Sequence, residues 1–186
     1  MFEMRDIVKS YGDKKVLNGI SLRAERGKPV CLFGPSGCGK TTLMNIAAGL
    51  LKPDGGSISE RGSISYVFQE DRLLPQSTAG ENIMLSSRDQ RAADDMIEAA
   101  GLRDCLELYP GSMSGGMKRR TAIARAAAFN GDIFLLDEPF SGIDEERKKL
   151  ICQCLKKLTK DKICIMVSHD KEDAELMDAE IIEIFR

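Results

Sequence analysis

The stretch that most constrains this chain is GPSGCGKT, from Gly34 to Thr41, which fits the phosphate-binding pattern G-x-x-x-x-G-K-[ST]. It follows the apolar run KPVCLFG at 28–34 and leads into TTLMNIAAGLL, so a strand, a glycine loop and a helix are predicted in that order. Glycines at these positions let backbone N–H groups approach a phosphate that any Cβ would hold away. The chain is therefore expected to bind a nucleoside triphosphate where a strand meets a helix.

Three side chains of this loop are expected to act on the phosphates and on a metal ion. Lys40 brings positive charge to the β- and γ-phosphates, the hydroxyl of Thr41 is a ligand for Mg²⁺, and Thr42 supports the α-phosphate. Cys38 is either a thiol with a lowered pKa at a helix start or a small side chain that fits the loop. The residues predicted to bind ATP here are Gly34, Pro35, Ser36, Gly37, Cys38, Gly39, Lys40, Thr41 and Thr42.

The run IFLLDEP at 133–139 supplies the second half of a nucleoside triphosphatase. Asp137 follows four apolar residues, where a buried carboxylate is costly unless a cation or hydrogen-bond donors accompany it. We therefore expect Asp137 to bind Mg²⁺. Glu138, the next residue, is suited to act as the base that takes a proton from the attacking water or orients it. The alternative is a solvated acidic turn, which does not account for the apolar run or for the phosphate-binding loop in the same chain.

Two further polar residues follow apolar runs and are candidates for the same site. Gln69 ends ISYVFQ and either caps the edge of a sheet or reaches Mg²⁺ and water. His169 follows IMVS and is the only histidine of the chain. A lone histidine is often structural, but at a strand end it is placed to contact the γ-phosphate.

A second candidate anion site lies in GSMSGGMKRRTAIARA at 111–126. Ser114, Gly115 and Gly116 stand where a helix is predicted to begin, and a helix start with free backbone N–H groups binds anions. Lys118, Arg119 and Arg120 follow in the first turns of that helix. The pattern raises the question of why one small chain carries two phosphate sites.

Tyr11 and Asp144 each have two open interpretations. Tyr11, in KSYGDKK, is either an ordinary surface residue or a ring that stacks on adenine. Asp144 suits the N-cap of a helix at 145–160, whose first turn carries Glu145 and Glu146. The same aspartate is also a candidate for a subunit boundary.

The order of predicted elements indicates an α/β fold, a P-loop nucleoside triphosphatase core. DIFLLDEP at 132–139 and ICIMVSHD at 163–170 read as buried parallel strands that carry a site at their ends. FEMRDIVKSY, ISLRAE and GSISERGSISYVFQ read as short antiparallel strands, and AEIIEIFR as a last strand. Helices are predicted at 88–102 and at 144–160, the second with an apolar face made of Leu150, Ile151, Cys154, Leu155 and Leu158. One domain is expected over 1–186, with a helical subdomain at about 71–129 inserted in the core and an antiparallel β subdomain in front.

Composition excludes several classes of protein. Lys and Arg total 27 against 29 for Asp and Glu, and this near balance argues against a surface that coats nucleic acid. The longest apolar runs fall far short of the roughly 20 residues that cross a membrane, and MFEMRDIVKS lacks a signal-peptide core, so a cytoplasmic location is expected. Six cysteines without CxxC spacing read as reduced thiols and not as a zinc site.

From Tyr11 to His169 the chain resembles the ATP-binding-cassette (ABC) ATPases, which have a RecA-like core. The resemblance lies in the order of the glycine loop, Gln69, the SGG helix start, LLDEP, SGID and SHD. In that family two subunits associate head to tail, and each ATP lies between one glycine loop and the partner's SGG turn. The resemblance implies that Ser114, Gly115 and Gly116 bind ATP in trans and that Asp144 lies across the dimer seam. It also implies an answer to the question of two sites, because the second one would hold a partner's γ-phosphate.

The segment VFQEDRLLPQSTAGENI is similar to the ATPase subunits of nitrate, sulfonate and taurine importers. In those proteins this region, here about Glu70 to Thr78, receives a coupling helix of the membrane subunit. The implied function is ATP hydrolysis that drives solute import, with transmembrane permease subunits, a second ATPase subunit and a solute-binding protein as partners. A plain surface loop is the alternative for RLLPQ, although Leu73 and Leu74 suit a docking patch.

The chain departs from the family pattern at three positions and at its end. Met113 and Met117 replace the leucine and glutamine of the usual Leu-Ser-Gly-Gly-Gln, and Gln76 stands where such importers tend to have tryptophan. The sequence ends at Arg186 without added C-terminal helices, which predicts a minimal module. Two rival functions remain: a non-transport ABC ATPase acting on DNA or the ribosome, and a catalytically weak subunit that binds ATP for a more active partner.

Overall fold

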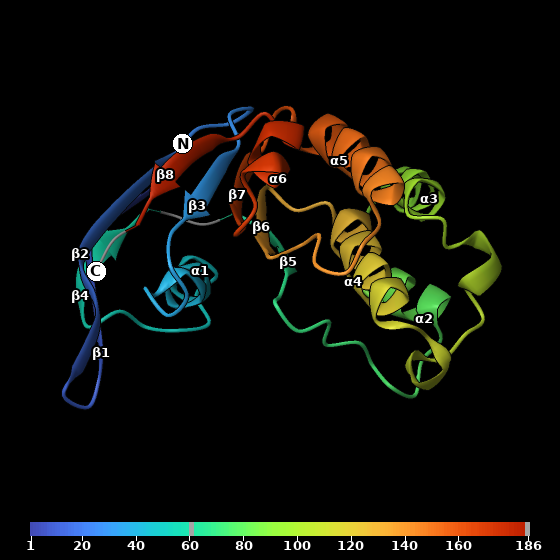
Figure 1. Cartoon of the computed structure of the whole chain (residues 1–186), viewed down its shortest axis with the longest axis horizontal. Helices are drawn as coiled ribbons and strands as arrows, with labels where there is room; N and C mark the ends of the chain where they lie inside the picture. The colour runs from blue at the N-terminus through green and yellow to red at the C-terminus, as the bar shows by residue number, and fades with distance from the viewer. Residues whose placement is uncertain (60–61, 185–186) are drawn as a thin grey trace.

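The computed structural model describes residues 1–59 and 62–184, which form two sheets and a set of helices (Figure 1). Glu60 and Arg61 of the predicted antiparallel segment, and Phe185 and Arg186 of the predicted last strand, lie outside the described residues. In chain order the elements are β1 Phe2–Tyr11, β2 Lys14–Ala24, β3 Val30–Phe33, α1 Lys40–Ala47, β4 Gly55–Ile58, β5 Ile64–Val67, α2 Ala79–Met84, α3 Gln90–Ala99, η1 Arg103–Cys105, η2 Pro110–Ser112, α4 Gly115–Phe129, β6 Ile133–Asp137, α5 Glu145–Thr159, β7 Ile163–Val167, α6 Lys171–Leu176 and β8 Glu180–Glu183.

A five-stranded parallel sheet, in the order β5-β6-β7-β3-β8, forms the centre of the molecule. Every residue of β6 and β7 is buried, which explains why both strands are continuous apolar runs. Asp137 at the end of β6 pairs with Val167 at the end of β7, and β7 in turn pairs with β3. The loops that follow β3, β6 and β7 therefore meet at one edge of the sheet, as the sequence predicted for the two buried strands.

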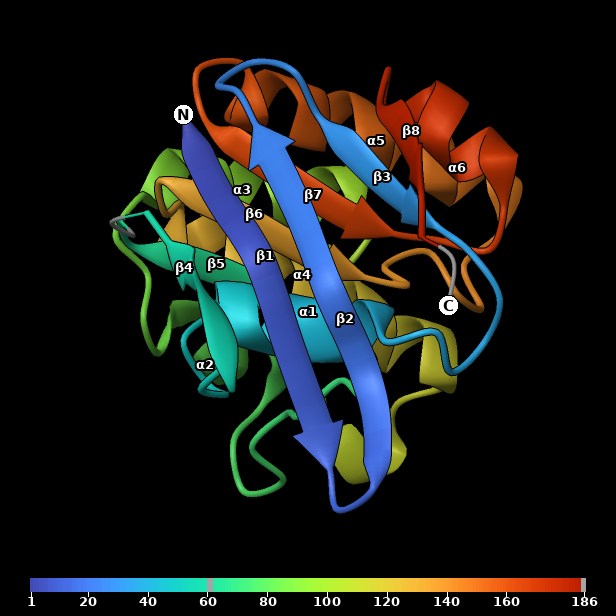
Figure 2. The same cartoon turned by 90° about the vertical axis from the view of Figure 1, so that its left-hand side faces the viewer.

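A three-stranded antiparallel sheet, in the order β2-β1-β4, forms a second layer, and α1 packs between it and the parallel sheet (Figure 2). Leu43, Met44 and Ile46 of α1 are buried among side chains of β1, β2 and β3. The prediction of antiparallel strands is confirmed for this sheet.

The prediction is wrong for β5, which pairs in parallel with β6. A buried serine explains the error, because Ser65 gives the strand the alternating polar pattern of a half-exposed one. The Ser65 hydroxyl donates to the carbonyl of Ala126 at 2.7 Å and accepts from the N–H of Gly131 at 3.0 Å. With its hydroxyl satisfied, serine is tolerated inside the sheet.

Helices α2, α3 and α4 form a layer on the opposite side of the parallel sheet from β1 and β2 (Figure 1). The predicted helix near 88–102 is present as α3, capped by Asp89, with Ala92, Met96 and Ile97 buried. Helix α4 is rich in buried alanine, which lets it lie close to the sheet. Over the described part of the chain, none of the helices combines the length and apolar character needed to cross a membrane.

Helix α5 is present as predicted, but its buried face differs from the expected one. Ile151 and Leu155 are buried, whereas Leu150 is 39% exposed. The buried face includes Lys148, whose amine lies 3.0 Å from a carboxylate oxygen of Asp173 in α6. Paired in this way, a lysine can occupy a buried position that hydropathy alone would assign to an apolar residue.

Candidate functional site

The glycine loop between β3 and α1 is shaped by positive backbone angles. Gly37 has φ +76° and Gly39 has φ +104°, a region that residues with a Cβ rarely adopt. A Cβ on Gly39 would also lie 2.7 Å from Leu17 of β2. Gly39 precedes the first turn of α1 without a side-chain cap, so the N-terminal backbone of that helix is presented to the loop.

Lys40 lies at the centre of this loop and is only 6% exposed. Its amine donates to the carbonyls of Gly34 at 2.8 Å and Pro35 at 3.0 Å, and lies 3.8 Å from Sγ of Cys38. The lysine therefore links the end of the loop to its beginning through hydrogen bonds, and it places a positive charge where an anion would bind.

Beside the loop lies a pocket of about 220 Å³ that collects most of the predicted site residues. Val16 and Val167 also line it, and sequence reasoning missed both, because only the packing of β2 and β7 brings them there. Tyr11, 53% exposed at the end of β1, is not among the lining residues. The predicted residues that line the pocket are Ser36, Gly37, Gly39, Lys40, Thr41, Thr42, Gln69, Asp137, Glu138 and His169.

Asp137 is the most deeply buried charge of this pocket, with 1% exposure. Neither of its carboxylate oxygens makes a hydrogen bond of full distance and angle among the described residues, although the Thr41 hydroxyl lies close enough to act on its pKa. Burial raises the pKa of Asp137, against the opposing effects of the Thr41 hydroxyl and of the charges on Arg119 and Lys40. A buried carboxylate left without a partner beside a threonine hydroxyl fits a hard cation such as Mg²⁺.

Glu138 is held next to Asp137 in an unusual backbone conformation. Its φ is +49°, and its N–H donates to the carbonyl of Val167 at 3.0 Å. Its Oε1 lies 3.0 Å from Nε2 of His169. Burial raises the pKa of Glu138, and the charge of Asp137 acts in the same direction while His169 and Lys40 oppose it. A raised pKa makes this carboxylate a better proton acceptor near neutral pH.

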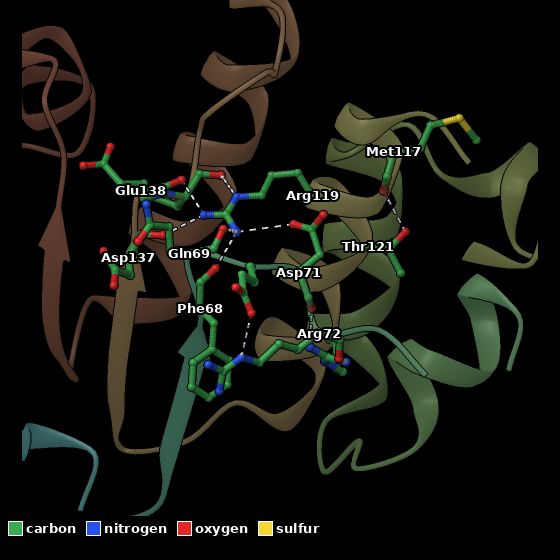
Figure 3. Close-up of polar contacts among 12 residues, drawn as sticks. Phe68, Gln69, Asp71, Arg72, Met117, Arg119, Thr121, Asp137 and Glu138 are labelled. Carbon is green, nitrogen blue, oxygen red and sulfur yellow. Dashed lines mark hydrogen bonds and ion pairs between the residues drawn. The ribbon is translucent and has the colours of Figure 1, made fainter. Parts of the chain in front are cut away.

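The side chains of Arg119 and Arg120 bind backbone carbonyls of their own chain. Arg119 is 4% exposed and points into the space between β6 and the segment after β5 (Figure 3). Arg120 donates to the carbonyls of Ala100 and Gly116. A backbone carbonyl that is shielded from water needs a hydrogen-bond donor, and these two arginines donate to such carbonyls.

The second predicted anion site lies at the exposed N-terminus of α4. The Ser114 side chain caps the helix by accepting the N–H of Met117 at 3.2 Å, while Gly115 is exposed. Asp144 caps α5 by accepting the N–H of Arg147 at 2.9 Å, and it too is exposed. None of the predicted residues Ser114, Gly115, Gly116 and Asp144 lines the pocket beside the glycine loop.

Comparison with known proteins agrees with this geometry. The family model described as ABC transporter matches residues 17–141, more than half of the chain. The aliphatic sulfonates import ATP-binding protein SsuB 1 of Pseudomonas syringae pv. syringae (strain B728a) is 39% identical over 180 residues, covering 94% of this chain and 76% of that protein. The sulfate/thiosulfate import ATP-binding protein CysA of Anthoceros angustus is 36% identical over 198 residues, covering 95% of this chain. The chain spans about half of the length of that second relative, 52%.

A solved structure shows the same arrangement of elements. The dimeric structure of MJ0796, a bacterial ABC transporter cassette, superimposes with a TM-score of 0.88 at 30% identity, covering 99% of this chain and 94% of the other. The fold class and the family expected from the sequence are thereby confirmed. The chain belongs to the ABC transporter family, as one of its ATP-binding cassettes.

Proposed function

We propose that this chain is the ATPase subunit of an ABC importer, converting ATP and water to ADP and phosphate as a head-to-tail dimer docked on permease subunits. The observation that carries the proposal is Asp137, a buried carboxylate without a hydrogen-bond partner among the described residues, next to a phosphate-binding loop. A solved post-hydrolysis state of MJ0796, bound to ADP and Pi, is similar to this chain with a TM-score of 0.87 at 30% identity.

The glycine loop would bind the phosphates of ATP through its backbone N–H groups, with Lys40 turned from its own carbonyls to the β- and γ-phosphates. Thr41, Asp137 and Gln69 would hold Mg²⁺. When bound, the ion neutralises charge that develops on the phosphates. Tyr11 would stack on the adenine from the end of β1.

Glu138 would take the proton from the attacking water, or orient it. Its raised pKa and its place in the pocket support this role. His169, 3.0 Å from Glu138, would contact the γ-phosphate and hold the carboxylate in position. Phosphoryl transfer needs mainly positioning and charge stabilisation, and these groups would supply both from one side of the nucleotide.

The second anion site would act on a nucleotide held by a partner subunit. Ser114, Gly115 and Gly116 would approach the γ-phosphate in trans, and Asp144 would lie at the seam. The exposure of this turn and the dimeric form of the similar cassette support the dimer.

A groove of about 450 Å³ near the segment 70–78 would receive the permease subunit. Leu50, Tyr66, Phe68 and Phe129 line it, with Arg72 lying 4.1 Å from the ring of Phe68. The apolar part of this lining suits a helix that docks from a membrane protein, and Arg72 and Arg125 add positive charge beside it. The named import functions of the relatives support an importer, which would place the chain at the cytoplasmic face of the membrane and add a solute-binding protein as a partner.

The decisive experiment is Glu138→Gln, assayed for phosphate release and for dimer lifetime. Turnover should fall by at least about a hundredfold, as expected when a general base is removed. ATP binding should persist, and the ATP-bound dimer should become long-lived in size-exclusion chromatography. Hydrolysis at the normal rate would contradict the role of Glu138.

A further inference from the structure

Arg119 is the most highly connected buried cation near the site (Figure 3). It extends from α4, yet its guanidinium lies among backbone groups of two other segments. From the β6 side it donates to the carbonyls of Asp137 at 2.6 Å, Glu138, and Pro139 at 3.1 Å. From the segment after β5 it donates to the carbonyls of Phe68 and Gln69 and contacts a carboxylate oxygen of Asp71 at 3.4 Å.

The three consecutive carbonyls that accept from Arg119 on the β6 side surround the backbone turn at Glu138. With φ +49°, Glu138 occupies the left-handed region, which is unfavourable for a residue with a Cβ and persists only where the surroundings hold it. Arg119 binds the carbonyls before, at and after this point. The guanidinium is therefore placed to stabilise the turn that directs the Glu138 side chain into the pocket.

The contacts on the other side attach Gln69 to the same guanidinium. Gln69 and Glu138 both line the pocket, but Gln69 follows β5 and Glu138 follows β6. Among the described residues, no hydrogen bond joins their two side chains. Arg119 bonds to the backbone of both. The pairing of β5 with β6 ends at Val67 and Leu136, and beyond that point Arg119 is a side chain from a third element that bonds to both segments.

We propose that Arg119 is a positioning residue for hydrolysis, which fixes Glu138 and Gln69 at the separation that hydrolysis requires. The inference rests on the proposed function, because that function assigns Glu138 to the attacking water and Gln69 to the Mg²⁺ ion. A planar guanidinium with five N–H donors spans both segments. A lysine amine carries the same charge but only three donors at one point, so it cannot reproduce the contacts.

The first test is amide hydrogen exchange on the nucleotide-free chain carrying Arg119→Met. Exchange should rise by about tenfold or more in segments 68–72 and 137–141, because both lose their common donor. Lys162→Met is the control: Lys162 is a half-buried cation, and it donates to the carbonyl of Asn130 at the opposite end of β6. In that variant only segments near 130 and 162 should exchange faster. Unchanged exchange in either 68–72 or 137–141 of Arg119→Met would overturn the proposal.

The second test is steady-state kinetics with ATP. In Arg119→Met, kcat should fall by about tenfold to a hundredfold, a loss typical of a catalytic group displaced by about 1 Å. KM should stay within about twofold, because the glycine loop that would bind the phosphates is not among the partners of Arg119. Lys162→Met should keep its kcat even if both variants melt at similarly lower temperatures. An Arg119→Met kcat equal to that of Lys162→Met, or full recovery of kcat in Arg119→Lys, would contradict the positioning role.

These measurements separate the inference from the proposed function. A wild-type chain that does not hydrolyse ATP contradicts the proposed function, whereas the exchange experiment still decides whether Arg119 holds the two segments. Normal wild-type turnover with unaffected Arg119→Met turnover contradicts the inference alone.

Discussion

The chain has two glycine-rich helix starts, and they differ in how much of an anion site each provides. The loop before α1 opens into a pocket that also contains Asp137, Glu138 and His169 of the same chain. The turn before α4 is exposed, and its Ser114 oxygen already accepts the N–H of Met117. Residues of the same chain surround the N-terminus of α1, whereas the N-terminus of α4 is exposed at the surface.

Gly39 and Gly115 have different structural constraints, although Gly116 of the second start is also confined, because a Cβ there would lie 2.8 Å from the carbonyl oxygen of Gly142. Gly39 is required by the fold itself, since its φ is +104° and a Cβ there would lie 2.7 Å from Leu17. A Cβ on Gly115 would meet no described atom within 4 Å, and its φ is not in the left-handed region. Nothing within the described chain demands glycine at 115, so the position is open to a group from outside the chain. A partner's nucleotide, as proposed, is such a group.

The largest effect that tests this contrast is expected from Lys40→Ala. ATP affinity should fall by about a hundredfold or more, because charge-assisted hydrogen bonds are worth about 1.5–3 kcal/mol each and this lysine would make them to two phosphates. Titration of ATP into dilute protein measures the loss. Ser114→Ala, tested in the same way, should bind ATP normally. A similar loss in both variants would remove the distinction between the two helix starts.

The next largest effect is expected from Gly115→Asp. Hydrolysis should fall by about tenfold to a hundredfold, because the new carboxylate would face the partner's γ-phosphate and like charges at an interface repel strongly. ATP binding by dilute protein and the melting temperature should change little, since the position is open and an acidic residue suits a helix N-terminus. Phosphate release at high protein concentration gives the rate.

Gly39→Ala is the contrasting variant, and it should lower the melting temperature because the new Cβ collides with Leu17. Wild-type hydrolysis by Gly115→Asp would contradict the assignment of this turn to a trans site. Unfolding of Gly115→Asp would show instead that the glycine serves the fold.

The smallest effect concerns the pH dependence of stability at Asp137. Burial raises the pKa of this carboxyl, so the folded chain binds more protons than the unfolded chain between the ordinary and the raised value. Stability without metal should therefore fall as pH rises through that window. Asp137→Asn should remove this fall and raise the melting temperature near neutral pH by a few degrees, since about 1 kcal/mol corresponds to about 2–4 °C.

Thermal melts between about pH 4 and about pH 8, with and without MgCl₂ and without nucleotide, check this expectation. Added Mg²⁺ should stabilise the wild type and not Asp137→Asn. Asp132→Asn is the control of opposite sign: hydrogen bonds from Ser63 lower the pKa of Asp132, so that carboxylate loses its stabilising effect as pH falls. A lower melting temperature for Asp137→Asn near neutral pH would contradict the idea of an unpaired buried charge.

Much of the fold was predictable from local patterns. The apolar runs that became β6 and β7 are buried on both faces, and a strand in that environment must be apolar throughout. The strand, loop and helix around Lys40 were predictable because glycine spacing reports backbone angles directly. The parallel pairing of β5 was not, since Ser65 is satisfied by Ala126 and Gly131, which are far away in the sequence.

The candidate site also has a part that was predictable from the sequence and a part that was not. Residue type and spacing predicted one site for Lys40, Asp137, Glu138 and His169, and all four side chains line the same pocket. The sequence placed Arg119 in the first turns of a helix and predicted no partner for it. In the structure its guanidinium binds carbonyls that belong to other elements.

Composition and order along the chain were thus enough to specify a nucleotide-binding α/β fold, since turn geometry and strand burial are properties of short segments. The three-dimensional packing alone settled which strands pair, that both oxygens of Asp137 are left without partners among the described residues, and that one arginine joins the backbones of Gln69 and Glu138. Those features depend on contacts between segments some 50 to 70 residues apart, such as Arg119 with Gln69 and Ser65 with Gly131, and no local pattern encodes such contacts.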